Sequence, residues 1–150
     1  MAMNKQVKYG YLYGPRLIIK DWPIAASQNF ENDSGKYVIL DANDRVEIAD
    51  SGDTQVEGWA EVGDLTSSAT AGADLCSVDV SCLAVFGMPS DADPANTRGE
   101  TCDLIVNSGN QQADIGESAE DVIKIFDFDT TNDLVAVAVN PNTAYTAGVA

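Results

Sequence analysis

The chain has 150 residues, of which 45% are hydrophobic, and it carries a formal net charge of −16 with no histidine. This length and apolar content suit one folded domain with a substantial core and exclude a disordered composition. No apolar run approaches the roughly 18 residues that span a bilayer, and residues 1–16 lack the apolar stretch of a secretory signal, so we expect neither membrane insertion nor secretion.

The charge is divided unevenly along the chain. Residues 1–45 hold six bases and five acids, whereas residues 46–150 hold two bases and nineteen acids. An acidic body repels phosphates, so we expect no nucleic-acid partner. Residues 1–20 carry four bases and no acid. This pattern fits an arm that docks on an acidic partner, or a solvated edge strand whose lysines prevent further pairing.

The first predicted strand lies in residues 7–13, "VKYGYLY". Because side chains alternate with period 2, one face of this strand holds Val7, Tyr9, Tyr11 and Tyr13. Lys8 and Leu12 fall on the opposite face. After the turn signal Gly14-Pro15, "RLIIKDW" continues the strand. We predict that the basic and aromatic side chains of this segment bind a partner: Lys5, Lys8, Tyr9, Tyr11, Tyr13 and Arg16.

A ladder of short strands and acidic turns follows. Strands are expected at residues 36–40, 45–49 and 54–62, with turns at 41–44 and 50–53. Gly58 inside the third strand indicates a bulge or a close backbone approach. Residues 76–88, "CSVDVSCLAVFGM", alternate as one strand.

Further strands are expected at residues 102–109, 121–128 and 133–139. Only residues 113–122, "ADIGESAEDV", suggest a short helical turn, with Ser118 as its N-cap.

No segment of ten or more residues has a good helical period, and turn signals separate the strands throughout. The pattern therefore predicts an all-β fold, a small sandwich or barrel of short, mainly antiparallel strands with extended terminal arms. We divide the chain into a basic and aromatic arm or edge strand (1–20), a β domain (21–140) and a flexible C-terminal tail (141–150).

Motifs that carry chemistry are missing. Serine and cysteine nucleophiles need a neighbouring base, most often histidine, and the chain has none. The acidic loops do not have EF-hand spacing, and turn chemistry accounts for their aspartates. We therefore predict no enzymatic activity, no cofactor and no metal site.

The three cysteines, Cys76, Cys82 and Cys102, form no CxxC pair and are poor evidence for zinc. If Cys76 and Cys82 share one strand, they lie about 20 Å apart and cannot bond to each other, although either can meet Cys102. We expect three buried free thiols.

Residues 30–62, "FENDSGKYVILDANDRVEIADSGDTQVEGWAEV", resemble the N-terminal part of capsid decoration, or cement, proteins of tailed bacteriophages. The matching pieces, strand–turn–strand–turn–strand, are Gly35–Asp41, Arg45–Ala49, Ser51–Asp53 and Val56–Ala60. The resemblance implies a small β-rich protein that binds the outside of an assembled shell, commonly as a trimer, and performs no chemistry. The expected partners are then the major capsid protein and two further copies of the chain, on the capsid exterior of a virion assembled from protein made in the host cytoplasm.

Other functions remain open. A carbohydrate-binding or receptor-binding β module on a virion needs exposed aromatic side chains, for which Trp59 and Tyr145 are the candidates. Another minor virion component, such as a tail-tube protein, is a further alternative. A hydrolase with a carboxylate pair is a further alternative, although no motif supports it.

Overall fold

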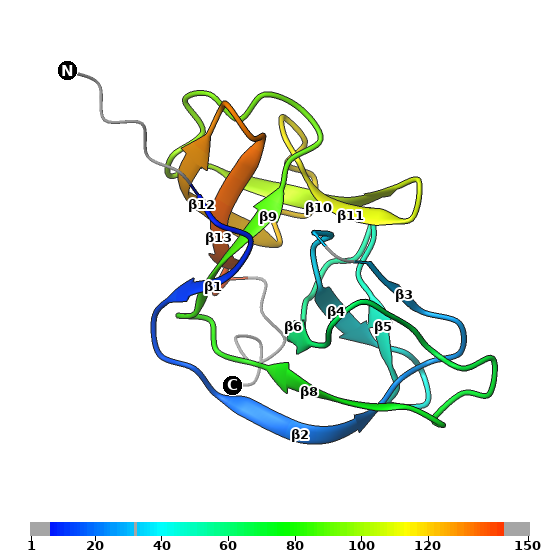
Figure 1. The fold of residues 1–150 in the computed structure, drawn as a ribbon. Helices are drawn as coiled ribbons and strands as arrows, with labels where there is room; N and C mark the ends of the chain where they lie inside the picture. The colour runs from blue at the N-terminus through cyan, green and yellow to red at the C-terminus, as the bar shows by residue number, and fades with distance from the viewer. Residues whose placement is uncertain (1–6, 32, 143–150) are drawn as a thin grey trace.

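The computed structural model describes residues 7–31 and 33–142. These residues form an all-β, sandwich-like fold of antiparallel sheets, which confirms the predicted fold class. No described residue belongs to a helix that could cross a membrane. Figure 1 shows a six-stranded sheet above a five-stranded sheet. Of the predicted terminal arms, residues 7–20 are described and take part in both large sheets, whereas residues 1–6 and 143–150 lie outside the described part.

The six-stranded sheet forms one half of the molecule. Its strands, in spatial order, are β1 (Gly10–Tyr13), β9 (Val85–Pro89), β13 (Leu134–Val139), β12 (Ile123–Asp129), β10 (Thr101–Asn107) and β11 (Asn110–Asp114). The strands predicted at 102–109, 121–128 and 133–139 correspond to β10, β12 and β13. Strand β11 was not predicted, because "NQQAD" lacks the apolar alternation that marks a strand.

The five-stranded sheet curls into a barrel-like half. Its strands, in spatial order, are β2 (Ile18–Pro23), β8 (Leu75–Asp79), β6 (Gly58–Glu61), β4 (Tyr37–Leu40) and β5 (Val46–Ile48). Beyond β2, Ile24 bridges Val46 on β5, so the first and last strands of the sheet meet. The short pair β3 (Asn29–Phe30) and β7 (Leu65–Thr66) adds Phe30 to the apolar interior of this half.

The prediction that residues 76–88 form one continuous strand is wrong. Residues 75–79 form β8 in one sheet and residues 85–89 form β9 in the other, with a turn between them. The carboxylate of Asp79 accepts the Ser81 N–H, and the Ser81 hydroxyl accepts the Leu83 N–H. Even-numbered side chains join the two main apolar clusters in both strands, Cys76 and Val78 in one and Phe86 and Met88 in the other, so the alternation in the sequence continues across the turn. Cys82 consequently does not share a strand with Cys76.

The helical turn predicted for residues 113–122 is also wrong. Strand β11 extends to Asp114, and no helix follows it. The N–H groups of Glu120 and Asp121 are bound by the buried carboxylate of Asp103, at 2.8 Å each, rather than by Ser118. A distant side chain on β10 therefore organises this loop.

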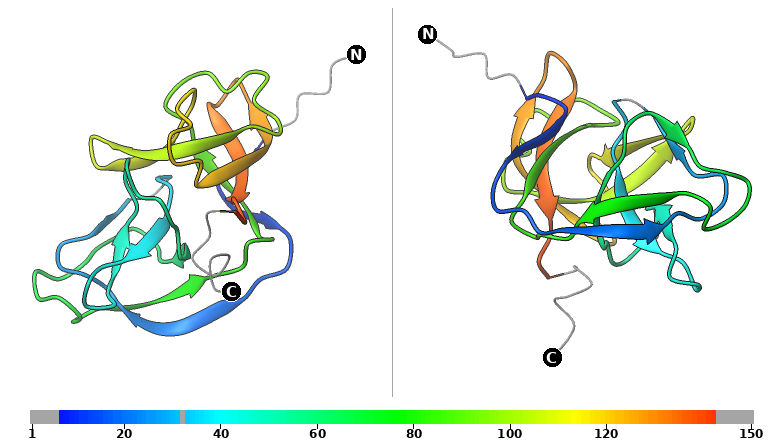
Figure 2. Two further views of the ribbon diagram at one scale, coloured as in Figure 1. Left: turned by 180° about the vertical axis from the view of Figure 1, so that it is seen from behind. Right: turned by 60° about the horizontal axis from the view of Figure 1, so that its bottom comes forward.

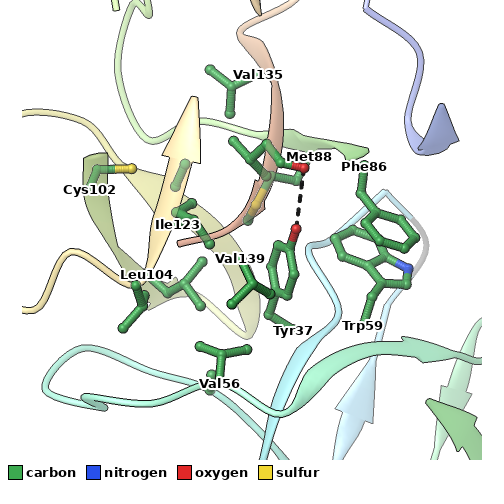
Figure 3. Close-up of a cluster of buried hydrophobic side chains, with 14 of the residues drawn as sticks. Tyr37, Val56, Trp59, Phe86, Met88, Cys102, Leu104, Ile123, Val135 and Val139 are labelled. Carbon is green, nitrogen blue, oxygen red and sulfur yellow. Dashed lines mark hydrogen bonds between the residues drawn. The ribbon is translucent and has the colours of Figure 1, made fainter. Parts of the chain in front are cut away.

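The main core lies between the two large sheets. Trp59 from β6 stacks on Phe86 from β9, with ring centroids 4.5 Å apart and an interplanar angle of 8° (Figure 3). Tyr37 from β4 meets the Trp59 ring edge-on at 5.0 Å, and its hydroxyl donates to the Val137 carbonyl of β13. Aromatic pairs of this kind add to the stabilisation that burial itself supplies.

Gly58 occupies the close backbone approach predicted for it. A Cβ atom at Gly58 would lie 2.1 Å from the carbonyl oxygen of Asp79, so only glycine allows β6 and β8 to pack this tightly. The three cysteines are free thiols, as predicted, but only Cys76 and Cys102 are buried, and the predicted burial of Cys82 is wrong because this residue lies in the partly exposed turn between β8 and β9. Burial raises the pKa of Cys76 to about 11 and that of Cys102 to about 12, which keeps both thiols protonated and poorly reactive.

Candidate functional site

Two connections cross between the sheets side by side and form one continuous antiparallel segment. Residues 10–23 contain β1, the connection and β2, and they run along residues 75–87. Gly10 pairs with Gly87 at one end, Pro23 pairs with Leu75 at the other, and the Val80 N–H donates to the Leu17 carbonyl between them. We call these two paired segments, residues 10–23 and 75–87, the edge ribbon. Figures 1 and 2 show β1 and β2 following each other along the outside of both halves.

The edge ribbon collects the exposed apolar side chains of the molecule. Eight large hydrophobic residues are exposed in the described part of the chain, and seven of them lie on this ribbon: Tyr11, Tyr13, Leu17, Ile18, Ile19, Leu75 and Leu83. Leu83 and Leu17 are 67% and 56% exposed. Scattered exposed leucines are ordinary, but such a concentration on one segment marks an interaction surface.

Arg16 holds the middle of the ribbon to the body. Its Nε donates to the Asp79 carboxylate at 2.8 Å, and a second guanidinium nitrogen pairs with Glu61. The guanidinium also lies over the Tyr11 ring, 4.1 Å from the centroid. Because the Asp79 side chain is fully buried, this is a structural ion pair. Arg16 was predicted to bind a partner, and the structure shows that its charge is already matched within the chain.

The other predicted binding residues separate into two groups. Tyr11 and Tyr13 lie on the ribbon and are 42% and 54% exposed, so they are available to a partner. The Tyr9 ring instead packs 6.1 Å from Trp59, and its hydroxyl donates to the Ser34 carbonyl. Burial, with a contribution from the charge of Asp33, raises the pKa of Tyr9 well above its usual value. Tyr9 is therefore a core residue.

The single face predicted for the odd-numbered residues 7–13 is wrong for Val7, which packs in a small cluster with Leu12, the residue assigned to the opposite face. Tyr9 and Tyr11 do contact the same stacked pair, Trp59 and Phe86, and Gly10 between them has a φ of +89°. Lys8 is exposed, but its carbonyl lies against Gly87, and Lys5 lies outside the described residues.

Leu17, Ile18 and Ile19 fall in the predicted docking segment, residues 1–20, but sequence reasoning did not name them as binding residues. "RLIIK" reads as a buried strand because three apolar residues follow one another. The basic residues at both ends, directly after a Gly-Pro break, were the available signal that this run lies at an edge.

A second cluster of charge lies away from the ribbon, on β11 and the loop after β9. The carboxyl group of Asp114 lies within hydrogen-bonding reach of Asp91, whose own carboxylate accepts the Ile115 N–H at 2.8 Å. Burial, the hydrogen bond to Asp91 and the charges of Asp91, Glu117 and Asp103 raise the pKa of Asp114 to about 6. Glycosidases hold their two carboxyl groups roughly 5–10 Å apart, so this hydrogen-bonded pair leaves no room for a sugar bond between its members.

The pair predicts a pH dependence of stability. In the unfolded chain Asp114 has an ordinary pKa, so between about pH 4 and pH 6 the folded state binds more protons and stability falls as the pH rises. Asp114→Asn cannot ionise, so its unfolding midpoint should exceed that of the parent at pH 7.5 and match it more closely at pH 4.

The gain in the free energy of unfolding at pH 7.5 should be only about 1 kcal/mol, because water screens the charge of a partly exposed carboxyl group. Thermal unfolding followed by circular dichroism at several pH values measures it. Asp93→Asn, in the exposed part of the same loop, is the control and should show no such trend. Equal pH profiles for Asp114→Asn and the parent would contradict the raised pKa of Asp114.

Other candidate sites offer little chemistry. In residues 7–31 and 33–142, no group of three or more histidine, cysteine, aspartate or glutamate side chains is arranged to hold a metal ion. A polar hollow of about 380 Å³ is lined by Gly99, Glu100, Thr101, Gly116 and Ser118. Trp59, a candidate for gripping sugar, is only 4% exposed and belongs to the core. Tyr145, the second candidate, lies outside the described residues.

The chain matches no family model, no curated protein and no solved structure. The features of the chain that bear on its function are the edge ribbon, the distribution of charge and the strand pattern of residues 30–62.

Proposed function

We propose that this chain is a non-enzymatic structural protein of a bacteriophage virion, which binds the exterior of the capsid and cements or decorates neighbouring capsid subunits. The observation that carries the proposal is the edge ribbon, an exposed apolar surface that crosses both halves of the molecule. Its outer strand, residues 10–23, holds two bases, Arg16 and Lys20, and a single acid, Asp21, in a chain with a net charge of −16. The proposed partner is the major capsid protein, and the ribbon fits a partner surface that is apolar with acidic neighbours.

The strand pattern of residues 30–62 supports the same proposal. Strands β4, β5 and β6 pair in antiparallel fashion, and the acidic residues between them build turns. The Asp41 carboxylate accepts the N–H groups of Asn43 and Arg45, and the Asp53 carboxylate accepts that of Asp50. These turns make a compact, water-facing body of the kind that can rest on a lattice, and copies bound side by side gain avidity. Association of three copies on the shell belongs to the proposal.

Replacing the most exposed apolar residues of the ribbon tests this function. Leu17→Asn with Leu83→Asn should leave the fold intact, because both side chains are more than half exposed. Burying a leucine side chain at an interface contributes about 1.5–3 kcal/mol, so the double variant should bind empty shells at least roughly tenfold more weakly. Co-sedimentation with purified shells measures the change, and electron cryo-microscopy of the particles reports occupancy.

Phe126→Asn is the matched control, because Phe126 is the one exposed large hydrophobic residue that the structure describes away from the ribbon. It should bind shells as the parent does. Unchanged binding of the double variant would place the docking surface elsewhere. Absence of shell binding by the parent protein itself would overturn the proposed function.

A further inference from the structure

The two large sheets end in four terminal strands, and these differ in how their outer edges are covered. On β5, the Val46 carbonyl accepts the Ala25 N–H at 2.9 Å. On β11, the carbonyls of Gln111 and Ala113 accept the N–H groups of Gly35 and Asp91. Strands β1 and β2 are the remaining terminal strands, and together they form the outer strand of the edge ribbon. Within the described residues, no hydrogen bond reaches the outer side of β2 between Ile18 and Lys20.

The hydrogen-bond pattern shows which backbone groups of β2 face outward. The Val80 N–H donates to the Leu17 carbonyl, and Ile18 lies opposite Asp79. In an antiparallel ladder this makes Ile18 and Asp79 a non-hydrogen-bonded pair, so the N–H and C=O of Ile18 point away from β8. Ile18 is 42% and Ile19 39% exposed, and Lys20 is also exposed. The left-handed backbone of Asp21, with a φ of +65°, lies in the register shift between Ile19 and Trp22 and ends this open stretch.

The charges on this edge decide what kind of chain can pair with it. A second copy of β2 laid antiparallel about Ile18 would place Lys20 of each copy opposite Arg16 of the other, and like charges opposite each other oppose self-pairing. Among the terminal strands of the two large sheets, a second copy offers no open acidic edge, because the outer edges of β5 and β11 are covered by the chain itself. A segment of another protein that carries both apolar and acidic side chains is complementary to this edge, because the apolar side chains can contact Ile18 and Ile19 and the carboxylates can pair with Lys20.

We propose that the open edge of β2, at Ile18–Lys20, binds an extended segment of the shell protein as an added β-strand, with apolar and acidic side chains alternating along that segment. The inference rests on the docking role proposed above for the edge ribbon. Main-chain hydrogen bonds to Ile18 then supply part of the affinity, and Lys20 selects an acidic strand over a basic one.

Proline at position 18 tests the main-chain contribution. Ile18→Pro removes the outward N–H and leaves the inward ladder to β8 in place, and proline is tolerated on edge strands where the lost N–H faces solvent. Ile18→Thr is the matched control, since it removes apolar surface at the same position but keeps the N–H. Ile18→Pro should reduce shell binding at least roughly tenfold, and Ile18→Thr should reduce it much less.

Hydrogen exchange keeps the test decisive if Ile18→Pro fails to fold. The Ile18 amide of the unaltered protein should exchange more slowly in the presence of shells. The same protection should appear with a short synthetic peptide that alternates valine and glutamate, and less with one that alternates valine and lysine. Lys20→Glu should reverse that preference.

The outcomes separate this inference from the proposed function. If Ile18→Pro binds shells like the parent while the Leu17 and Leu83 double variant does not, the ribbon docks through side chains alone and strand addition is overturned. If light scattering shows a dimer of the parent that Ile18→Pro abolishes, the edge pairs with a second copy and the proposed occupant is wrong. Unchanged exchange at Ile18 on shells to which the protein is bound overturns it as well.

Discussion

Replacing Gln111 with leucine is expected to lower the free energy of unfolding by about 3–5 kcal/mol. Gln111 is completely buried between the two large sheets. Its Oε1 accepts the Tyr37 N–H at 2.9 Å, and its Nε2 donates to the carbonyls of Tyr37 and Ala49 at 2.8 Å each. Leucine has nearly the same volume but leaves the Tyr37 N–H and the Ala49 C=O without partners in the core. Each buried backbone group left unpaired costs about 1–3 kcal/mol.

Gln112→Leu is the control for this prediction. Gln112 is the next residue of β11, partly exposed, and its side chain accepts one hydrogen bond from Asn107 at the surface. Its replacement should change stability by no more than about 0.5 kcal/mol. Urea unfolding with the slope compared between variants measures both effects. Similar losses for the two variants would show that Gln111 contributes through volume alone.

The second large effect is expected at Arg16. Arg16→Met should destabilise the fold by about 3–5 kcal/mol, because it leaves the buried carboxylate of Asp79 without its cation. The N–H groups of Leu17 and Ser81 still donate to Asp79, at 3.2 and 3.1 Å, but they carry no full charge. The substitution also removes the guanidinium from the Tyr11 ring and so loosens the edge ribbon.

A double-mutant cycle separates the charge from the packing. In Arg16→Met combined with Asp79→Asn no buried charge remains, so the double variant should regain part of the stability that Arg16→Met loses. Arg98→Met is the surface control: Arg98 pairs with Asp127 at 2.8 Å, but its side chain is 61% exposed. Its replacement should cost no more than about 1 kcal/mol. A double variant less stable than Arg16→Met would contradict the buried-charge explanation.

These stability effects bear on how the docking surface is tested. Removing residues 1–13 would delete β1 and Tyr9, which contacts Trp59 in the core, so loss of shell binding by that truncation would not identify an interface. Substitutions at Leu17, Ile18 and Leu83 avoid this problem, because those side chains have little contact with the core. The edge ribbon can therefore be altered at its surface while Arg16 keeps it in place.

The sequence predicted much of the secondary structure and little of the docking surface. Strands β4, β5, β6, β10, β12 and β13 were predicted because their side chains alternate and glycine or aspartate turns bound them. Strand β11 was not predicted because one of its two buried residues is a glutamine, whose partners are distant backbone groups. Of the predicted binding residues, the structure places Tyr11, Tyr13 and Arg16 on the ribbon. Leu17, Ile18 and Ile19 lie in the predicted docking segment, residues 1–20, but were not named as binding residues.

Local physics explains what the sequence determined by itself. Alternating apolar residues require a strand, and glycine or aspartate between two such runs requires a turn, because these preferences depend only on neighbouring residues. The all-β class and the acidic turns of residues 41–53 follow from this. The preferences do not say which face of a strand another sheet will cover.

Only the tertiary structure decides which faces and edges of the strands are covered by other parts of the chain and which stay exposed. The two strands within residues 75–89 have one unbroken alternation but belong to different sheets, and the strands in residues 10–23 follow them to the outer edge of both. That position leaves Ile18 and Ile19 exposed, although they look like core residues, and it brings Arg16 onto a carboxylate 63 positions away. Sheet order depends on contacts between residues far apart in the chain, which no local pattern contains.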